Sequence, residues 1–325
     1  MKNNTSDQSP KLEDFIKNTK IDLEKKIEEM ITDKKIAATL EGGKRLRPLL
    51  AHLSFKACTQ GKEKPDQHEK ALEGAVVIEL AHAASLVHDD IIDNDIERRG
   101  KPAFHVNNGI GSAILTGHKM LIIGFNIALK HGKDWAKLYI DSWNEIVNGE
   151  LDEVTFNGKN NNYLKETATK SQIFKTYIKI IDLKTAALFS SVCKAGAIEA
   201  NVSNELLNLV ADYGREIGLA YQLADDLVDL ANGEMIDSVV IPLLNRLEKN
   251  GTKIKALEKR DIQKEFEKNK DKIIDFYIEE IKKHVIKAEK LSRSKIIPES
   301  PYKKLLTEFP SYIINEMLKE INIAV

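Results

Sequence analysis

Residues 71–93 read ALEGAVVIELAHAASLVHDDIID, an apolar stretch that ends in three aspartates. It contains no proline and is rich in alanine, so it predicts a long helix, and its small side chains let a neighbouring helix approach closely or leave a cavity. Residues four apart on a helix are offset by only about 40° around the axis, so Asp89 and Asp93 share one face. The segment therefore predicts a helix that points two carboxylates the same way beside an apolar lining.

Helical spacing continues on both sides of this segment. No proline occurs between Pro102 and Pro242, which disfavours the turn-dense sequence of a β-sandwich or barrel. We expect a polar loop at 157–162 and solvated, Lys/Glu-rich helices at 253–295. Apolar residues at helical spacing predict the remaining helices at 12–31, 49–57, 112–129, 135–153, 171–200, 205–230 and 239–249.

These helices predict an all-α fold, because consecutive amphipathic helices bury their apolar faces against each other. We find no linker and no fixed-period repeat. The expected architecture is a single-domain bundle of about ten or more mostly antiparallel helices around a central cavity, spanning residues 1–325. Residues 1–10 are expected to form a flexible N-terminus.

The charges of the chain nearly cancel. Its 325 residues carry 49 Lys plus Arg and 50 Asp plus Glu, a formal net charge of −1, which argues against a surface for nucleic acid or anionic membrane. The N-terminus has no apolar signal core, and apolar stretches such as Met120–Leu129 are shorter than a membrane span. Cys58 and Cys193 lack a metal-binding or CxxC spacing. We expect a cytoplasmic protein with buried free thiols.

The aspartate motif of the opening segment occurs a second time. DDIID at 89–93 is followed by DDLVD at 225–229, again after an apolar helical approach. One copy alone would equally suit an acidic, solvated turn, whereas two copies favour a common task. Carboxylate oxygens suit Mg²⁺, which commonly bridges to substrate phosphates. The candidate metal ligands are Asp89, Asp90, Asp93, Asp225, Asp226 and Asp229.

Arginine is concentrated near the first aspartate motif. Only eight of the 49 basic residues are arginine, and four of these are Arg45, Arg47, Arg98 and Arg99. The planar guanidinium binds phosphate oxygens through two hydrogen bonds, so this distribution favours phosphate recognition. GGKRLRP at 42–48 combines glycines, which permit close backbone approach, with three cations just before a helix.

Five motifs occur in a fixed order between about Gly42 and Leu247. Together they resemble the trans-isoprenyl diphosphate synthases, the polyprenyl synthetase family that includes farnesyl and geranylgeranyl diphosphate synthases. The resemblance implies the all-α isoprenoid synthase fold and a Mg²⁺-dependent condensation, in which an allylic diphosphate ionises and the double bond of isopentenyl diphosphate attacks the resulting cation. The motifs are GGKRLRP from Gly42, HAASLVHDDIID from His82, RRGKP from Arg98, LKTAALF from Leu183 and GLAYQLADDLVD from Gly218.

The resemblance also implies a role for each matching residue. Asp89, Asp93 and Asp225 match the principal metal ligands, with Asp90, Asp226 and Asp229 supporting them. The residues that match the isopentenyl diphosphate site are Lys44, Arg47, His82 and Arg99. Those that match the allylic side are Arg98, Lys184, Thr185 and Gln222. The catalytic set is Asp89, Asp93, Asp225, Lys184 and Arg98.

Product length is implied by small residues before the first motif. In the family the growing chain runs down from this motif, and bulky residues four or five positions earlier stop it. Here Ala84 and Ser85 leave the path open, which favours geranylgeranyl diphosphate and a stop at Val77, Ile78 or within 115–125. The alternatives are a longer-chain polyprenyl or a farnesyl diphosphate synthase, or a non-catalytic partner subunit. A terpene cyclase is disfavoured, because a second DDxxD and the GGKRLRP loop serve two diphosphates. A homodimer is expected.

Three positions depart from the family pattern. The family usually has lysines in a longer loop after its second aspartate motif, but here Asp229 leads to 239–242 without them, leaving Lys249 or Lys253 as candidate substitutes. Gly117-His118-Lys119 stands where Gly-Asp is usual. Tyr221 replaces the usual phenylalanine before Gln222.

Overall fold

The computed structural model describes residues 10–157, 170–233 and 259–324. The expected loop at 157–162, the helix at 239–249, Lys249 and Lys253 lie wholly or mostly outside these residues. The helices are α1 (Leu12–Met30), α2 (Lys34–Leu40), α3 (Leu46–Thr59), α4 (Pro65–Ile92), α5 (Phe104–Asn108), α6 (Ile110–His131), α7 (Lys133–Asn157), α8 (Lys170–Ile181), α9 (Ala187–Glu199), α10 (Asn204–Asn232), α12 (Lys259–Ser292) and α13 (Pro301–Leu318). Their dominance confirms the predicted all-α class.

Two short elements near the N-terminal aspartate motif were not expected from the sequence. Helix α2 is capped by Asp33, which precedes it and whose side chain accepts hydrogen bonds from the backbone N–H groups of Lys35 and Ile36. Strands β1 (Glu97–Arg98) and β2 (Lys101–Pro102) form an antiparallel hairpin. Arg99 and Gly100 connect them with φ values of +55° and +71°, the backbone of a two-residue type I′ turn.

The chain divides into two compact units. The first comprises Met1–Ile140, Ser191–Val210 and Lys295–Leu306, and the second comprises Asp141–Ser190, Ala211–Ser294 and Thr307–Val325. Helices α7, α9, α10 and α13 run from one unit into the other. The expectation of a single domain stays a prediction.

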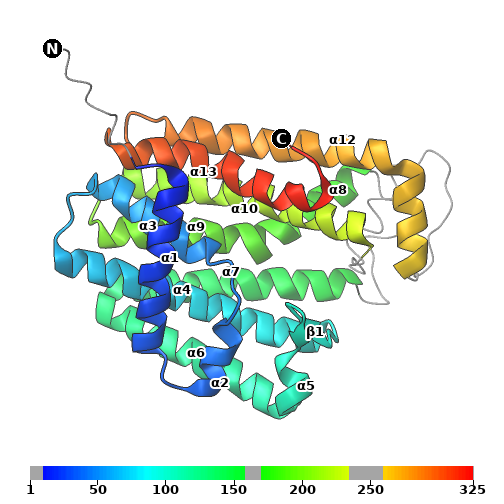
Figure 1. The fold of residues 1–325 in the computed structure, drawn as a ribbon, viewed down its shortest axis with the longest axis horizontal. Coiled ribbons are helices and arrows are strands. Elements are labelled where there is room, and N and C mark those ends of the chain that lie inside the picture. Colours follow the sequence, from blue (N-terminus) through cyan, green and yellow to red (C-terminus); the bar gives the residue numbers. More distant parts are fainter. Residues whose placement is uncertain (1–9, 158–169, 234–258, 325) are drawn as a thin grey trace. The chain divides into compact units, whose positions relative to one another are not determined.

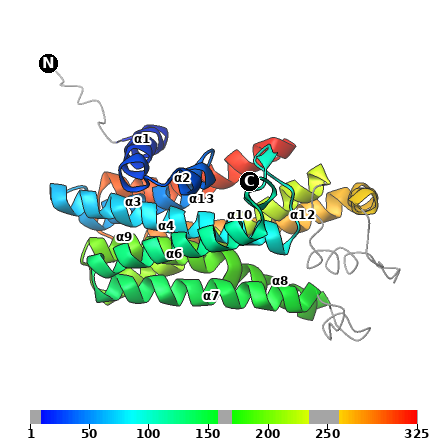
Figure 2. The ribbon, with the colours of Figure 1, turned by 90° about the horizontal axis from the view of Figure 1, so that it is seen from below.

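Helix α4 is the centre of the first unit. It lies between α3 and α6, and α1 crosses over α3 and α4 (Figures 1 and 2). A methyl group at Gly74 would lie 2.7 Å from Trp135, and one at Gly117 would overlap His88, so these glycines permit close packing. A hydrophobic cluster joins α1, α2, α4 and α6 through Ile27, Ile31, Ile36, Leu40, Val76, Leu80, Ala83, Ala84 and Met120. The small residues of the opening segment therefore serve helix packing.

The second unit is built around α10 and α12. Helix α12 buries one stripe of apolar residues at helical spacing, and lysines and glutamates occupy its other faces. His284 Nδ1 lies 2.6 Å from Glu216 Oε2, which ties α12 to α10. The rings of Phe174 and Phe276 meet edge to face at 5.3 Å between centroids, joining α8 to α12. The buried stripe consists of Phe266, Ile273, Tyr277, Ile281 and Val285.

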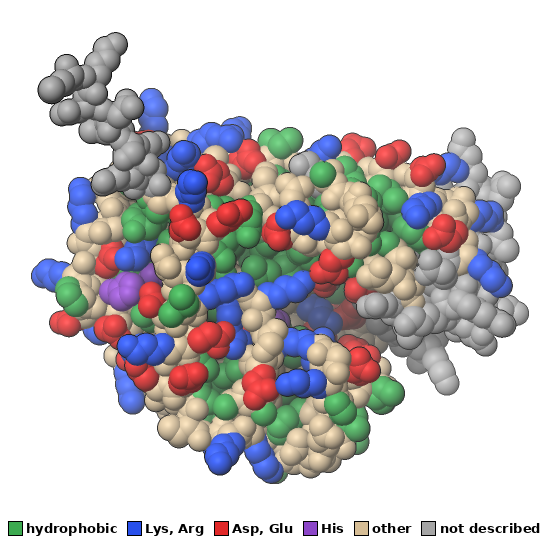
Figure 3. All heavy atoms as spheres, in the orientation of Figure 1, with side chains coloured by type: hydrophobic (Ala, Val, Ile, Leu, Met, Phe, Trp, Pro, Cys, Tyr) green, Lys and Arg blue, Asp and Glu red, His purple; other side chains and the backbone are tan. Residues whose placement is uncertain are grey.

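Helix α6 is a long apolar helix that includes the stretch Met120–Leu129. By length and composition it meets the criterion for crossing a membrane, with a mean hydropathy of 1.4, and 28% of its most apolar window is buried. It extends well beyond the apolar stretch Met120–Leu129. Figure 3 shows Lys and Arg side chains interspersed with Asp and Glu side chains on one face. Cys58 and Cys193 are buried and free, as predicted.

Candidate active site

The first aspartate motif lies at the end of α4. Asp89 is half-buried and Asp93 is exposed, whereas Asp90 is only 3% exposed. Arg98 of β1 donates two hydrogen bonds to Asp90 Oδ1, one of them from Nε at 2.7 Å. Burial raises the pKa of Asp90, and the Arg98 guanidinium opposes this shift. The middle carboxylate of the motif is therefore neutralised by a cation within its own unit.

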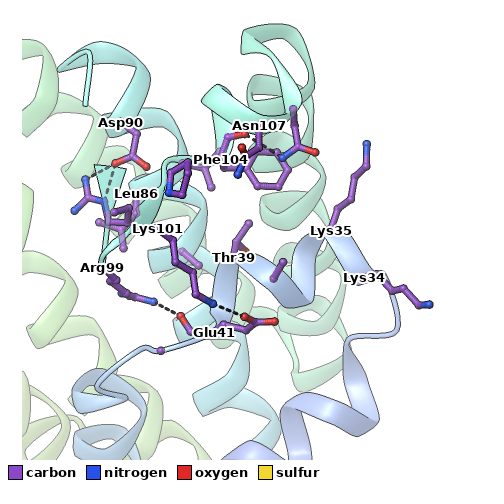
Figure 4. A pocket seen from close by; sticks show the side chains of 17 residues that line it. Lys34, Lys35, Thr39, Glu41, Leu86, Asp90, Arg99, Lys101, Phe104 and Asn107 are labelled. Atoms are coloured by element: carbon purple, nitrogen blue, oxygen red, sulfur yellow. Dashed lines mark hydrogen bonds and ion pairs between the residues drawn. The ribbon is translucent and has the colours of Figure 1, made fainter. Parts of the chain in front are cut away.

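The hairpin also joins this motif to the chain just before the glycine pair. Arg99 Nη1 donates to the backbone oxygen of Glu41 at 2.8 Å, and Lys101 Nζ lies 3.0 Å from Glu41 Oε2. Figure 4 shows Arg99 and Lys101 both pointing toward Glu41. The left-handed backbone of Arg99 is uncommon for a residue other than glycine, and such strain clusters at functional sites.

Arg45 of the GGKRLRP loop turns into the protein. Its side chain is 4% exposed, and its guanidinium binds Glu24 Oε1 at 2.7 Å and Glu79 Oε1 at 2.8 Å. It adopts φ +58°, and a methyl group at Gly43 would overlap its guanidinium and approach Glu79 to 2.8 Å. The loop therefore closes over a buried ion pair, and its three cations divide into one anchor, Arg45, and two candidates for phosphate binding, Lys44 and Arg47.

Arg47 and His82 form a pair between α3 and α4. Arg47 Nη1 lies 3.0 Å from His82 Nε2. A guanidinium can only donate, so Nε2 accepts this hydrogen bond and the imidazole is neutral. Burial, followed by the charges of Arg47, Arg99 and Arg98, holds the pKa of His82 well below its usual value. The first unit thus gathers three residues of the predicted isopentenyl diphosphate site, Arg47, His82 and Arg99, while Lys44 is exposed nearby in sequence.

The second unit places Lys184 and Thr185 on a π-helical turn, η2 (Asp182–Ala186), between α8 and α9. Such turns occur frequently at functional sites. Lys184 Nζ lies 2.7 Å from Glu153 Oε2 and 3.1 Å from Glu150 Oε1, both on α7. A methyl group at Gly149 would lie 2.7 Å from the backbone nitrogen of Lys184, so this glycine lets α7 approach the turn.

A chain of hydrogen bonds connects this turn to the second aspartate motif. Thr185 Oγ1 donates to Gln222 Oε1 at 2.7 Å, and Gln222 Nε2 donates to Asp226 Oδ1 at 2.9 Å. The Tyr177 hydroxyl donates to Asp226 Oδ2. Asp226 is 5% exposed, and burial raises its pKa to about 7. The middle aspartate of this motif is therefore held by neutral donors, while Asp225 and Asp229 are half-buried.

The two residues expected to line the path of the growing chain have different surroundings. Ala84 is fully buried in the hydrophobic cluster of the first unit. Ser85 is half-buried, and its hydroxyl donates to the backbone oxygen of His82 at 2.8 Å. Enlarging Ala84 would therefore strain the core, whereas Ser85 is the better position at which to probe chain length.

Sequence reasoning missed the partners that hold these residues in place. Glu79 is an acid inside the apolar run VVIELAH, and such a position signals a buried ion pair. Tyr177 and Glu153 carry no comparable signal, because their partners are distant in the sequence.

The carboxylates suit magnesium by their chemistry. Within residues 10–157, 170–233 and 259–324 no group of three or more His, Cys, Asp or Glu side chains could hold a metal ion. Mg²⁺ does not require such a group, because it usually binds one or two carboxylates together with substrate phosphates and water. The pairs Asp89 with Asp93 and Asp225 with Asp229, four apart on their helices, fit this mode.

The chain belongs to the polyprenyl synthetase family, whose model matches residues 28–238. The two aspartate motifs and the basic loop at 42–48 lie inside the matched region. The match confirms the family indicated by the five sequence motifs.

Two curated relatives and one solved structure are similar to this chain. A short chain isoprenyl diphosphate synthase of Methanothermobacter thermautotrophicus is 37% identical over 59% of this chain and 56% of its own length. A geranylgeranyl diphosphate synthase of Methanosarcina mazei is 31% identical over 60% of this chain and 57% of its own length. The matched region thus spans little more than half of these relatives. A solved geranylgeranyl pyrophosphate synthetase from the archaeon Geoglobus acetivorans covers 92% of this chain and 99% of its own, with a TM-score of 0.72 and 26% identity.

Proposed function

We propose that the protein is a trans-prenyltransferase that condenses isopentenyl diphosphate with an allylic prenyl diphosphate, forming geranylgeranyl diphosphate. The observation that carries the proposal is that each unit combines one DDxxD motif with its own cationic group. In the first unit this group contains Arg47 and Arg99, and in the second it contains Lys184. The reaction needs carboxylates to hold the metal for the departing diphosphate and cations to bind both diphosphates, and the chain supplies both kinds of residue.

Asp89, Asp93, Asp225 and Asp229 would hold Mg²⁺. When bound, the metal supplies positive charge that stabilises the departing diphosphate. Asp90 and Asp226 hold these ligands in position, because each is buried and hydrogen-bonded to a partner within its own unit. Their role is to fix the end of the helix that carries the outer aspartates.

The remaining residues bind and orient the two substrates. Lys44, Arg47 and Arg99 bind isopentenyl diphosphate, and neutral His82 orients Arg47 by accepting its hydrogen bond. Arg98 and Lys184 face the allylic diphosphate, while Thr185 and Gln222 hold each other in place beside the developing cation.

In the reaction the allylic C–O bond breaks and its electron pair leaves with the diphosphate. The double bond of isopentenyl diphosphate then forms the new C–C bond with the allylic cation. The carbocation that results loses a proton to the released pyrophosphate. Such a reaction asks the protein chiefly for preorganised positive charge.

The activity is tested by incubating the purified chain with Mg²⁺, farnesyl diphosphate and labelled isopentenyl diphosphate. Elongated prenyl diphosphate on chromatography supports the proposal. A cyclised hydrocarbon would identify a terpene cyclase, and activity only after a second, different chain is added would identify a partner subunit.

The same chromatography reads product length. A twenty-carbon product is expected, and Ser85→Phe is expected to shorten it by filling the path below the aspartates. A longer product would favour a polyprenyl synthase. A fifteen-carbon product as the end point from geranyl diphosphate would favour a farnesyl synthase.

We also propose a homodimer in the cytosol. Helix α6 exposes a row of apolar side chains seven residues apart, the spacing of a helix–helix seam. The row consists of Leu115, Ile122 and Leu129. A second copy of the chain would cover it, and light scattering should give twice the chain mass for the wild type and the monomer mass for Leu115→Glu/Ile122→Glu. The buried free thiols suit a reducing compartment.

A further inference from the structure

The π-helical turn η2 begins at Asp182 and carries Lys184 and Thr185, which the proposed function places on the allylic side. The backbone N–H of Ala187 donates to the backbone oxygen of Asp182, five residues earlier, so the turn holds one residue more than an α-helical turn. Because of this extra residue, Lys184 and Thr185 lie at angles around the helix axis that a regular α-helix would not give them. The position of the turn therefore decides where the Lys184 amine and the Thr185 hydroxyl lie.

Two glycines make room for this turn between the helices on either side of it. A methyl group at Gly149 of α7 would lie 2.7 Å from the backbone nitrogen of Lys184. A methyl group at Gly218 of α10 would lie 2.5 Å from Cα of Ala186. Glycine has no polar side chain, so these contacts limit how far the turn can move but do not hold it through hydrogen bonds.

Arg215 of α10 binds the first residue of the turn. Its Nε donates to Asp182 Oδ1 at 2.6 Å, and its Nη2 donates to Asp182 Oδ2 at 2.8 Å. The same Nη2 lies 3.4 Å from Glu145 Oε2 of α7. Two parallel hydrogen bonds between a guanidinium and a carboxylate fix both the distance and the plane of the pair. One side chain thus connects α10, α7 and the beginning of the turn, all within the second unit.

The charged residues lie one helical turn from the two glycines. Arg215 precedes Gly218 by three residues and Glu145 precedes Gly149 by four, so each charged side chain shares a helix face with its glycine. The side chains of Arg215 and Asp182 are 34% and 28% exposed, so water reaches the pair and its contribution to stability is modest. Its main effect is then on the geometry of the turn rather than on the free energy of unfolding.

We propose that Arg215 is a positioning residue that holds the π-helical turn, and with it Lys184, in the place where Lys184 binds the allylic diphosphate. The kinetic consequence rests on the proposed function, whereas the fixing of the turn does not. Arg215 and Asp182 lie just outside the motifs at 218–229 and 183–189, so those motifs do not predict the pair. A misplacement of about 1 Å far from the reacting atoms can slow a reaction on the order of 10²-fold, so the contact is able to influence the rate.

The kinetics of Arg215→Gln test the proposal, because glutamine keeps part of the stem but lacks the charge and the paired donors. The KM for farnesyl diphosphate should rise roughly tenfold and kcat should fall by a similar factor, while the KM for isopentenyl diphosphate stays unchanged. Arg215→Lys keeps the charge and can still donate to Asp182, so it should restore most of the loss. The control Glu216→Ala breaks the neighbouring contact of α10 with His284 on α12 and should leave both KM values unchanged.

Asp182→Asn separates positioning from a simple effect of charge. The amide keeps the shape of the carboxylate but turns an N–H group toward the guanidinium, so only one of the two hydrogen bonds remains. Positioning predicts a higher KM for farnesyl diphosphate in both Arg215→Gln and Asp182→Asn. A through-space effect predicts opposite changes, because the first substitution removes a positive charge and the second removes a negative one. Opposite changes would overturn the proposal.

The fixing of the turn has a readout that does not need activity. Amide hydrogen exchange in peptides covering residues 182–187 should be roughly tenfold faster in Arg215→Gln than in the wild type, and unchanged in Glu216→Ala. Should Arg215→Gln fail to fold, Arg215→Lys and Asp182→Asn supply the same comparison.

Two further results would overturn the proposal. One is equal exchange of these amides in the wild type and the Arg215 variants. The other is an unchanged KM for farnesyl diphosphate in Arg215→Gln, which would reduce the pair to a structural contact. If the wild type elongates no prenyl chain, the proposed function fails, and the exchange rates still decide whether Arg215 holds the turn.

Discussion

The two aspartate motifs have the same pattern, yet their middle residues are stabilised in different ways. Asp90, at the end of α4, is paired with the Arg98 guanidinium, whereas Asp226, on α10, accepts hydrogen bonds from neutral Tyr177 and Gln222. Both carboxyl groups are buried, and burial raises the pKa of each. The difference shows that a repeated motif specifies which residues point outward, while the surrounding unit decides how the inward residue is neutralised.

The largest effect is expected at the outer aspartates, where the two motifs should behave alike. Asp89→Ala and Asp225→Ala should each lower the elongation rate by roughly 10³-fold, because each removes a carboxylate that holds the metal. The helical circular dichroism should stay unchanged. The exposed controls Asp66→Ala and Asp212→Ala, one in each unit, should keep full activity. A large loss in only one motif would show that the two are not equivalent.

The second-largest effect is on the free energy of unfolding, and it distinguishes the first aspartate motif from the second. Arg98→Ala leaves the buried Asp90 carboxylate without its cation and should lower the free energy of unfolding by about 2–3 kcal/mol. This lies below the full cost of breaking a buried ion pair, because the Arg98 side chain is 36% exposed and water can partly replace it. Urea denaturation measures the change. Arg293→Ala, which removes a more exposed arginine, should change stability by less than about 0.5 kcal/mol.

Tyr177→Phe is expected to cost less than Arg98→Ala, about 1–2 kcal/mol by the same measurement. The substitution removes one neutral donor, and Asp226 keeps the hydrogen bond from Gln222 and can hold its own proton at a pKa of about 7. Tyr312→Phe, on α13 of the same unit, is a control for the loss of a hydroxyl from a half-buried tyrosine. A loss from Tyr177→Phe as large as that from Arg98→Ala would contradict the distinction between the motifs.

The smallest effect is a pH dependence from Asp226. Its folded pKa of about 7 lies above the unfolded value near 3.9, so between these values the folded chain holds a proton that the unfolded chain has released. The contribution of Asp226 to stability is therefore present below about pH 4 and is lost as the pH rises to about 7, with a slope of at most about 1.4 kcal/mol per pH unit. Asp226→Asn lacks this titrating group, so the difference in free energy of unfolding between wild type and variant should change with this slope across pH 5, 6 and 7. A constant difference would show that Asp226 is ionised throughout.

Much of the fold was predictable because helix periodicity is a local property. The apolar spacing predicted α1, α3, α4, α6, α7 and α10 to within a few residues at most ends, although α4 begins six residues earlier, at Pro65. It did not predict α2 or the hairpin, because each is too short to show a period. Helix α13 was also not predicted, and it contains Pro310 in its interior.

The candidate site was predictable only in part, for the same reason. The spacing of the motif places Asp89 and Asp93 on one face, whereas Asp90 is rotated by about 100° and must point elsewhere. What it meets there is Arg98, eight residues on, while the corresponding Asp226 meets Tyr177, forty-nine residues away. Arg45 and Arg47 likewise look equivalent in the sequence, yet one binds Glu79 in the interior and the other binds His82.

The sequence by itself determined the helical class, the order of the five motifs and the family, because these depend on local spacing and residue type. Tertiary structure alone decided which of two neighbouring arginines anchors the basic loop, how each middle aspartate is neutralised, and that Arg215 binds the first residue of the turn that carries Lys184. The physical reason is that burial and charge pairing depend on segments distant in the chain. A buried carboxylate accepts whatever donor the fold brings to it, be it a guanidinium in one unit or a tyrosine hydroxyl in the other.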